Sequence, residues 1–323
     1  MSKETWKQEK ESNFDILKIK PEDFASQLTL RDLPVFKKIT AEELTSGEWT
    51  NKNRNELAPN IAEFTYRFNM ICLWTQREIL SLDKTNKRAE LIEHFLWISK
   101  KLIILNNIHA CFAIVAALLS QSIYRLSKTW NKVGTKEKSM FEKFFHLFSS
   151  ENNWSQLRKF TDSRKIPCIP HIGIYLTDLM FIQNVMKRKQ TPFGERSNHE
   201  LNMDSMIRTI ASFQDSSYDE LEVIPELQRY LESICFDRNE IKTEEERLYC
   251  RSLEIEPGDG STPKRSSFSY LTNLSFRIRT PSNPHRNSLT TETKTKSLTP
   301  SMKPKFIKSH RKAQSLGNPS GFG

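Results

Sequence analysis

The residues whose types and spacing could do chemistry lie in one stretch, "IPCIPHIGIYLTDLMFIQN", residues 166–184. Its apolar run carries Thr177, Asp178 and Asn184, which a core helix does not need and a transmembrane helix would exclude. Met180 and Asn184 are four residues apart, so a helix places both on one face. That face is a candidate for contact with another molecule. The alternative is a buried amphipathic helix in which Met180 only fills the core.

The motifs of covalent and metal chemistry are missing from the sequence. It contains no G-x-x-x-x-G-K-[ST], G-x-S-x-G or HExxH motif and no paired cysteines at zinc-finger spacing. His109 lies in an apolar helix, where a hydrogen-bonded core residue is more common than a ligand. We therefore expect no cofactor, no metal site and no enzyme of covalent chemistry.

The basic charge of the chain is concentrated in its last part. The 323 residues carry a net charge of +10. Residues 261–323 contain twelve Lys or Arg and one acidic residue, Glu292, which leaves 37 basic and 38 acidic residues elsewhere. This tail is rich in Ser, Thr and Pro and cannot bury enough apolar area to offset its ordering entropy. We predict an N-terminal extension over 1–19, a folded domain over 20–257 and a disordered basic tail over 258–323.

The periodicity of the folded part predicts an all-α fold. Its apolar residues recur at three- and four-residue steps, and no run alternates as strands do. "TAEE" at 40–43 has the form of a capping box, and Pro59 stands just inside a helix start. Two asparagines and a histidine interrupt the apolar stretch 102–119, which indicates a helix end and a buried second helix rather than a membrane span. Further helices are expected at about 108–120, 136–149, 172–188, 201–214, 219–234 and 241–252.

The cysteines and the N-terminus indicate a cytoplasmic protein. The five cysteines are odd in number, widely spaced and without a CxxC motif, as is usual for reduced thiols in the cytosol or nucleus. The first residues, "MSKETWKQEKES", contain no apolar core of a signal peptide.

Several blocks of the sequence carry a family resemblance. They are "LTLRDLPVFKKITAEELTSGEWT" (28–50), "APNIAEFTYRFNMICLWTQREIL" (58–80), "KRAELIEHFLWISKKLIILNNIHACFAIVAALLSQSIYRLSKTW" (87–130), "IPHIGIYLTDL" (169–179) and "SLEIEP" (252–257). Together they resemble the Cdc25-homology, or RasGEF, catalytic domain over about residues 20–257. The segments 21–30, 56–60 and 67–69 are most similar to Ral guanine nucleotide exchange factors with a PH domain and an SH3-binding motif. We expect this chain to lack that PH domain and the separate helical exchanger domain of many relatives.

The resemblance implies a fold and an activity. The fold is a helical bowl with a projecting helical hairpin, and the activity is to bind a Ras-type GTPase, open its nucleotide site and release GDP. By the family pattern the catalytic residues are Thr177, Met180 and Asn184, with Met180 reaching the magnesium site of the GTPase. Asn184 stands where many members have an acidic residue, so its share in exchange would be small. Residues 181–198 would form the hairpin tip, with the returning helix beginning near Leu201.

Six more residues match family positions at the GTPase-binding surface: Arg67, Asn106, Asn107, Asn153, Trp154 and His171. Arg67 is expected to lie away from the apolar stripe of its helix; the alternative is a solvated surface charge. The asparagine pair could instead satisfy backbone groups at a helix break, and both roles can coexist. The last three residues would pack around switch II of the GTPase, although a tryptophan in a helical protein also serves as core.

The tail carries two kinds of interaction signal. Pro281, Pro284 and Arg286 in "PSNPHR" fit P-x-x-P followed by a basic residue, a ligand of SH3 domains. Three serines follow basic residues, as basophilic kinases prefer: Ser267, Ser288 and Ser315. Phosphate there would lower the charge of a tail that could bind anionic lipid at the plasma membrane. The alternative is a merely solvated tail.

Three functions from different classes therefore remain to be separated. The leading hypothesis is an exchange factor for a Ras-family GTPase, with Ral as the first candidate. The second is a non-catalytic adaptor of the same fold that acts through its SH3 motif and basic tail. Nucleic-acid binding ranks last, because the tail lacks interleaved aromatic residues or RGG repeats.

Overall fold

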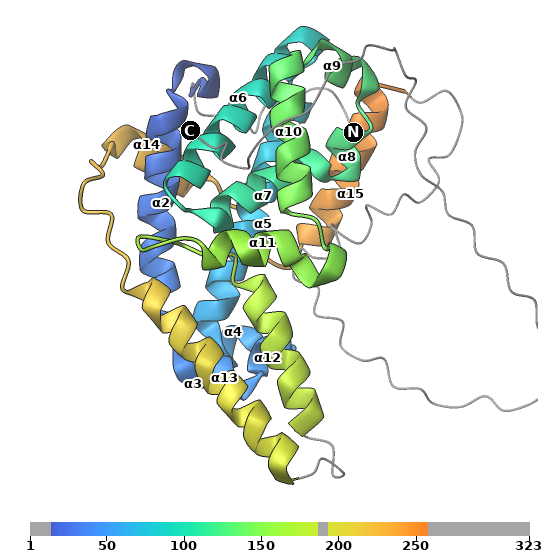
Figure 1. The fold of residues 1–323 in the computed structure, drawn as a ribbon. Helices are drawn as coiled ribbons and strands as arrows, with labels where there is room; N and C mark the ends of the chain where they lie inside the picture. The colour runs from blue at the N-terminus through green and yellow to red at the C-terminus, as the bar shows by residue number, and fades with distance from the viewer. Residues whose placement is uncertain (1–13, 187–192, 258–323) are drawn as a thin grey trace, which may run out of the picture. The chain divides into compact units, whose positions relative to one another are not determined.

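A computed structural model describes residues 14–186 and 193–257, which belong to one compact unit. The described residues form helices and no strand, which confirms the all-α prediction (Figure 1). In chain order the elements are η1 (Ile16–Lys18), α2 (Pro21–Lys37), α3 (Ala41–Ser46), η2 (Glu48–Thr50), α4 (Arg54–Leu57), α5 (Pro59–Leu80), α6 (Thr85–Ile104), α7 (Ile108–Leu119), α8 (Gln121–Tyr124), α9 (Ser127–Lys132), α10 (Thr135–Leu147), α11 (Glu151–Asp162), α12 (Gly173–Met186), α13 (Phe193–Gln214), α14 (Pro225–Ser233) and α15 (Ile241–Ile255).

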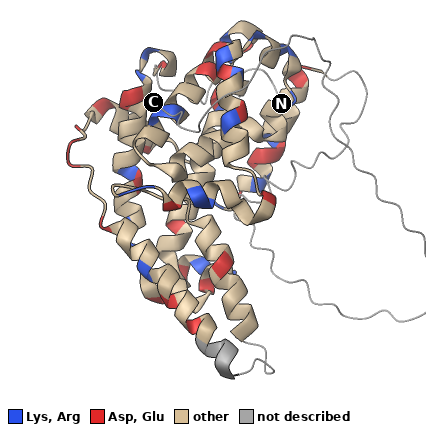
Figure 2. Ribbon diagram, viewed as in Figure 1, with Lys and Arg blue, Asp and Glu red and all other residues tan. Residues whose placement is uncertain are grey.

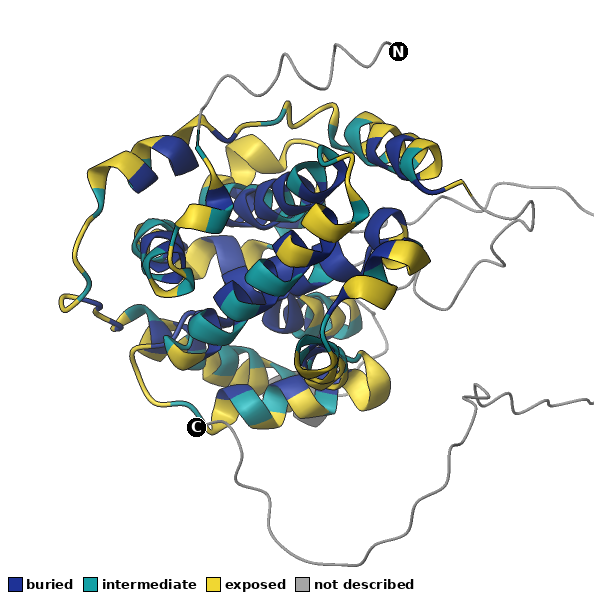
Figure 3. Ribbon diagram, turned by 90° about the horizontal axis from the view of Figure 1, so that it is seen from above, coloured by how far each residue is buried: buried dark blue, intermediate teal, exposed yellow. Residues whose placement is uncertain are grey.

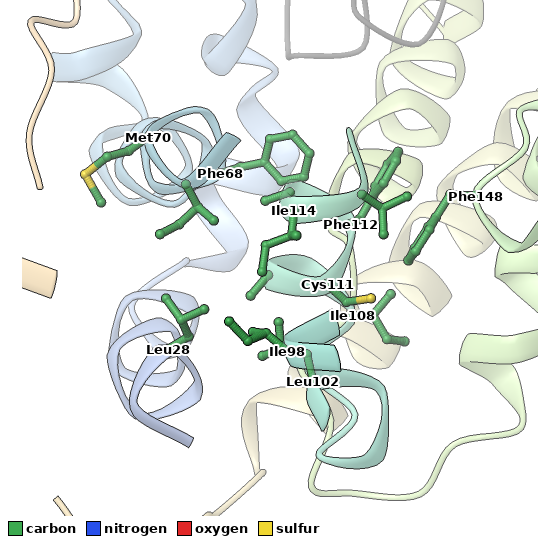
Figure 4. Close-up of a cluster of buried hydrophobic side chains, with 14 of the residues drawn as sticks. Leu28, Phe68, Met70, Ile98, Leu102, Ile108, Cys111, Phe112, Ile114 and Phe148 are labelled. Atoms are coloured by element: carbon green, nitrogen blue, oxygen red, sulfur yellow. The ribbon is translucent and has the colours of Figure 1, made fainter. Parts of the chain in front are cut away.

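Helix α7 lies at the centre of the core. All of its residues except Ala116 are buried, as expected for a helix that is apolar on every side. It packs against α5 and α6, while α2 covers both of these helices. Figure 4 shows side chains of α7 beside Phe68 of α5 and Leu102 of α6. Figure 3 shows that the buried faces of the surrounding helices turn inward and the exposed faces outward.

Several helix starts follow the local sequence signals. Thr40 and Glu43 form the expected capping box: the Thr40 Oγ1 accepts from the Glu43 N–H at 3.2 Å, and the Glu43 Oε2 accepts from the Thr40 N–H at 3.1 Å. Pro59 is the first residue of α5, as predicted. The apolar stretch 102–119 is broken between α6 and α7, which confirms two helices in place of one span. Among the described helices, none combines the length and the apolar character needed to cross a membrane.

The helices α12 and α13 contact each other and project side by side from the rest of the body (Figure 1). The predicted start of the returning helix near Leu201 was wrong, since α13 already begins at Phe193. Gly194 does not prevent this, because one glycine inside a helix costs only about 1 kcal/mol. The hairpin is therefore longer than the sequence periodicity indicates.

The predicted helix 219–234 is also shorter than expected. Helix α14 begins at Pro225, its first helical residue. A proline has no N–H for an interior helical hydrogen bond and is favoured at a helix start, so residues before it fall outside the helix.

The "SLEIEP" block closes the C-terminal end of the folded body. The buried Glu256 carboxylate accepts hydrogen bonds from the Thr129 hydroxyl at 2.5 Å, the Lys128 N–H at 2.9 Å and the Arg88 guanidinium at 3.0 Å. Burial opposes ionisation of Glu256, but these donors outweigh it and lower its pKa below the ordinary value. The block thus fastens the end of α15 to α6 and α9.

Candidate functional site

The segment that leads into α12 is fastened to the turn between α6 and α7. The Ile169 N–H donates to the Asn106 carbonyl at 2.9 Å, and the Ile108 N–H donates to the Ile169 carbonyl at 2.9 Å. The Asn106 side-chain amide donates to the Pro167 carbonyl at 3.1 Å. Asn106 has φ of 55°, a left-handed conformation that asparagine tolerates better than most residues. These bonds fix where α12 leaves the body.

Asn107 and Arg67 meet in one buried polar network. The Asn107 Oδ1 caps α7 by accepting from the Ala110 N–H at 3.0 Å, and its Nδ2 donates to the Asp32 carboxylate at 3.0 Å. The Arg67 Nη2 and Nε donate to the Asp32 Oδ1 at 2.7 and 3.0 Å. The network joins α2, α5 and α7. The alternative for the asparagine pair, satisfaction of backbone groups at a helix break, is confirmed.

The expectation that Arg67 lies away from the apolar stripe was wrong. Arg67 is only 6 % exposed, and its guanidinium and the Asp32 carboxylate are both buried. The position borders the apolar stripe of α5, and Asp32 of α2 supplies the negative charge that permits burial there. Through Asp32, Arg67 therefore holds α5 against α2.

An aromatic cluster holds two of the predicted residues inside the body. His171 and Trp154 each pack edge-on against Phe112, with ring centroids 4.7 and 5.6 Å apart. Both residues are buried, and His109 lies in the same cluster. Burial lowers the pKa of His171 well below its ordinary value and that of His109 to about 3, the latter helped by the nearby Arg67 charge. In the free chain these rings pack on one another.

Helix α11 begins in an unusual turn. Asn152, Asn153 and Trp154 have φ values of 49°, 55° and 61°, so three successive residues are left-handed. Asparagine accepts this conformation readily, but tryptophan does not. The turn leaves Asn153 exposed and Trp154 buried. The Asn153 carbonyl accepts a hydrogen bond from Arg158 Nε at 2.8 Å.

Arg158 connects this turn to α12. Its Nη1 lies 2.6 Å from Asp178 Oδ2 and its Nη2 lies 3.0 Å from Asp178 Oδ1, a bidentate ion pair. The local sequence pattern does not reveal Arg158, although its partner Asp178 is one of the polar residues that set the stretch apart.

A second contact fixes α12 against α3. The Gln183 side-chain amide donates to the Thr45 carbonyl at 2.9 Å. Its amide oxygen lies over Gly47, where an added Cβ would overlap it. Gly47 also has φ of 73°, a conformation that favours glycine. A side chain at position 47 would therefore displace the end of Gln183 and strain the turn.

The three predicted catalytic residues lie on α12 but differ in exposure. Thr177 and Asn184 are exposed, whereas Met180 is half-buried and packs against the core. The Thr177 hydroxyl donates to the Gly173 carbonyl at 2.8 Å, within its own helix. The structure therefore places all three residues on one helix. Met180 partly fills the core, as the alternative of a buried amphipathic helix predicts.

The site is a projecting feature and not a cavity. Two cavities in the described part of the chain, of about 310 and 170 Å³, are lined partly by residues of α5. None of the predicted site residues lines either cavity. A protruding helix with an exposed polar and apolar face is suited to enter a partner rather than to receive a small molecule.

Comparison with known proteins now decides the family. The model of the RasGEF domain matches residues 23–207. This chain belongs to the RasGEF domain family. The matched RasGEF segment runs from α2 into α13 and includes α12 entirely.

Relatives of this RasGEF chain include mouse "Ras-specific guanine nucleotide-releasing factor RalGPS1", which is 40 % identical over 312 residues, 94 % of this chain and 52 % of the relative. Human "Ras-specific guanine nucleotide-releasing factor RalGPS2" is 40 % identical over 255 residues, 79 % of this chain and 43 % of the relative. The rat "Ras-specific guanine nucleotide-releasing factor 1" is 35 % identical over 236 residues, 73 % of this chain and 18 % of the relative. The chain thus spans about half the length, or less, of these relatives.

Proposed function

We propose that this RasGEF chain is a guanine nucleotide exchange factor that releases GDP from a Ras-family GTPase, with Ral as the first candidate. The family match and the names of the most similar relatives support this function. The structural observation that carries it is α12, a helix fastened at several points that projects with an exposed face. The proposal is that this helix enters the nucleotide site of the GTPase.

The chemistry of such exchange is a matter of differential binding. A GTPase holds GDP through backbone amides, a lysine and Mg²⁺, and these contacts are strong only in a closed site. A helix that occupies the open site stabilises the nucleotide-free state, so the GDP complex becomes less stable by comparison. No bond of the nucleotide is broken, and no general acid or base is needed.

The residues of α12 would act by exclusion. Met180 offers no hard oxygen ligand to Mg²⁺, so its approach displaces water and ion without replacing either. Asn184, which is exposed, has an amide in place of a carboxylate and cannot compete as an anion for the phosphate-binding groups. We infer that Asn184 contributes less than Met180 to exchange.

The contacts that hold α12 to the body would make this insertion effective. Binding energy opens the partner only if the inserted helix does not bend away instead. The Arg158–Asp178 ion pair ties α12 to α11, and the Gln183–Thr45 hydrogen bond ties it to α3. The bonds of Asn106 hold the segment that leads into α12. We infer that they are positioning contacts for exchange.

The predicted SH3 ligand and the three serines lie outside the described residues. We propose that Pro281, Pro284 and Arg286 bind an SH3 domain and that the basic tail attracts the chain to anionic membranes. Sedimentation with vesicles of phosphatidylserine and phosphatidylcholine tests the second part: binding should weaken as salt rises and after phosphorylation. Equal binding to vesicles of phosphatidylcholine alone would contradict it.

The exchange proposal is tested by complex formation. We expect the chain to co-elute in gel filtration with a nucleotide-free Ral, Rap or Ras protein and to dissociate when excess GDP or GTP is added. Equal binding to nucleotide-free and nucleotide-loaded forms would point to the adaptor alternative. Binding to none of the three would contradict both the exchange function and this partner class.

A further inference from the structure

The most exposed large apolar residue of α12 is Phe181, which stands beside Met180. It is 64 % exposed, whereas the next residue, Ile182, is 5 % exposed and Leu179 is fully buried. Met180 packs against the core along part of its surface. The side chain next to Met180 that α12 exposes most is therefore an aromatic ring, while the methionine is half-buried.

The contacts of α12 keep Phe181 on the outside. Gln183 donates to the Thr45 carbonyl at 2.9 Å, and Asp178 pairs with Arg158 at 2.6 Å. A rotation of α12 that buried Phe181 would break both contacts and expose Ile182. The exposure of the ring is thus imposed by the docking of its helix.

Phe181 forms a stripe with two other exposed residues. Thr177 lies four residues before it and Asn184 three residues after it, so the three side chains share one helix face. We name these residues the insertion stripe. The stripe has an aromatic centre and a small polar group at each end, which is the composition of an interface centre rather than of a solvated helix face.

The insertion stripe carries no charge. From Leu179 to Met186 the helix has no Asp, Glu, Lys or Arg, and Figure 2 shows this part of α12 without charged colour. A charged partner surface would lose hydration against such a stripe without gaining an ion pair. An apolar surface next to polar backbone groups is the complementary partner.

From these observations we propose that Phe181 is a binding contact of the exchange reaction: its ring packs on an apolar part of the GTPase beside the nucleotide, with Thr177 and Asn184 bonding to groups at its edges. This inference rests on the proposed exchange function.

The test uses two matched truncations in the full chain. Phe181→Ala removes the ring from α12, and Leu201→Ala removes a side chain of equal exposure, 65 %, from the other hairpin helix. Neither should lower the melting temperature, because both side chains are mostly in solvent. GDP release from the GTPase that responds to the wild type is then measured, together with binding of the chain to the nucleotide-free form.

We expect Phe181→Ala to lower the exchange rate constant and the affinity by about tenfold or more, because aromatic anchors at an interface centre cost at least this much when truncated. Phe181→Leu should recover a large part of this loss, and Leu201→Ala should stay near the wild type. Exchange unchanged in Phe181→Ala, or lowered equally in Leu201→Ala, overturns the inference. A wild-type dimer that Phe181→Ala dissociates also overturns it, because the stripe would then serve a second copy of the chain.

The wild-type rate separates the two proposals. A wild type that releases GDP while Phe181→Ala does the same leaves the exchange function standing and removes only the role of Phe181. A wild type that accelerates no release removes the exchange function, and the inference fails with it.

Discussion

Arg158 and Asp178 form a bidentate ion pair that joins α11 to the projecting helix α12, with N–O distances of 2.6 and 3.0 Å. The Arg158 guanidinium also donates to the Asn153 carbonyl, so the left-handed turn at the start of α11 is part of the same connection. The ion pair in this way links the turn at Asn153 to α12, two predicted site regions that are 20 residues or more apart in the chain. The pair is a candidate for the orientation of the hairpin.

Asp178→Asn tests this orientation. The substitution keeps the shape of the side chain but removes its charge, so we expect a loss of about 1 kcal/mol in the free energy of unfolding and slower GDP release. Urea unfolding and exchange assays measure the two effects. The control is Asp204→Asn, which removes a largely exposed pair with Arg208 on α13 and should change neither quantity. An Asp178→Asn variant with wild-type exchange would show that the pair does not position the hairpin.

The buried Arg67–Asp32 pair predicts a larger effect on stability. In Arg67→Met the Asp32 carboxylate stays buried without its cation, so we expect the free energy of unfolding to fall by about 3–5 kcal/mol. Arg67→Met combined with Asp32→Asn should recover part of this loss, because the uncompensated charge is gone. Urea unfolding of both variants checks the prediction. Full stability of Arg67→Met with loss of GTPase binding would instead make Arg67 a direct contact.

The buried histidines predict that acid destabilises the fold. In the folded chain burial lowers the pKa of His109 and His171, and partial burial lowers the pKa of His94. Below the unfolded pKa of about 6.5, the unfolded chain therefore binds more protons than the folded chain. The free energy of unfolding then decreases as the pH is lowered, by up to about 1.4 kcal/mol per pH unit for each such histidine. Urea unfolding between neutral pH and the onset of carboxylate titration measures this slope.

His171→Phe is the matched variant for the pH dependence. Phenylalanine keeps an aromatic ring against Phe112 and cannot take up a proton. The change of the free energy of unfolding per pH unit should therefore decrease by the contribution of one histidine. An unchanged slope would show that His171 does not contribute to the acid sensitivity.

The sequence was sufficient for the elements whose signals are local or strongly periodic. The apolar character of residues 108–119 on every side predicts a buried helix, and α7 is one. The capping box at Thr40 and the start at Pro59 depend on neighbouring residues alone and were found in full. The family resemblance supplied what periodicity does not contain, namely the hairpin and its candidate face.

Other features depend on partners distant in sequence and could not be predicted from local pattern. Arg67 is buried only because Asp32, 35 residues earlier, pairs with it. Arg158 was missed because its partner Asp178 is on another helix. The exposure of Phe181 follows from the docking of Gln183 on the turn at Thr45, 138 residues away in the chain. Such contacts are properties of the packed structure.

The central claim is that α12 enters the nucleotide site of a Ras-family GTPase. The most direct measurement is release of fluorescent GDP from purified Ral, Rap and Ras proteins, with the wild-type chain and with Met180→Ala. We predict accelerated release from at least one of them, Ral first, and a loss of about tenfold in Met180→Ala while the variant remains folded. No acceleration on any of the three GTPases, or an undiminished rate in Met180→Ala, would contradict it.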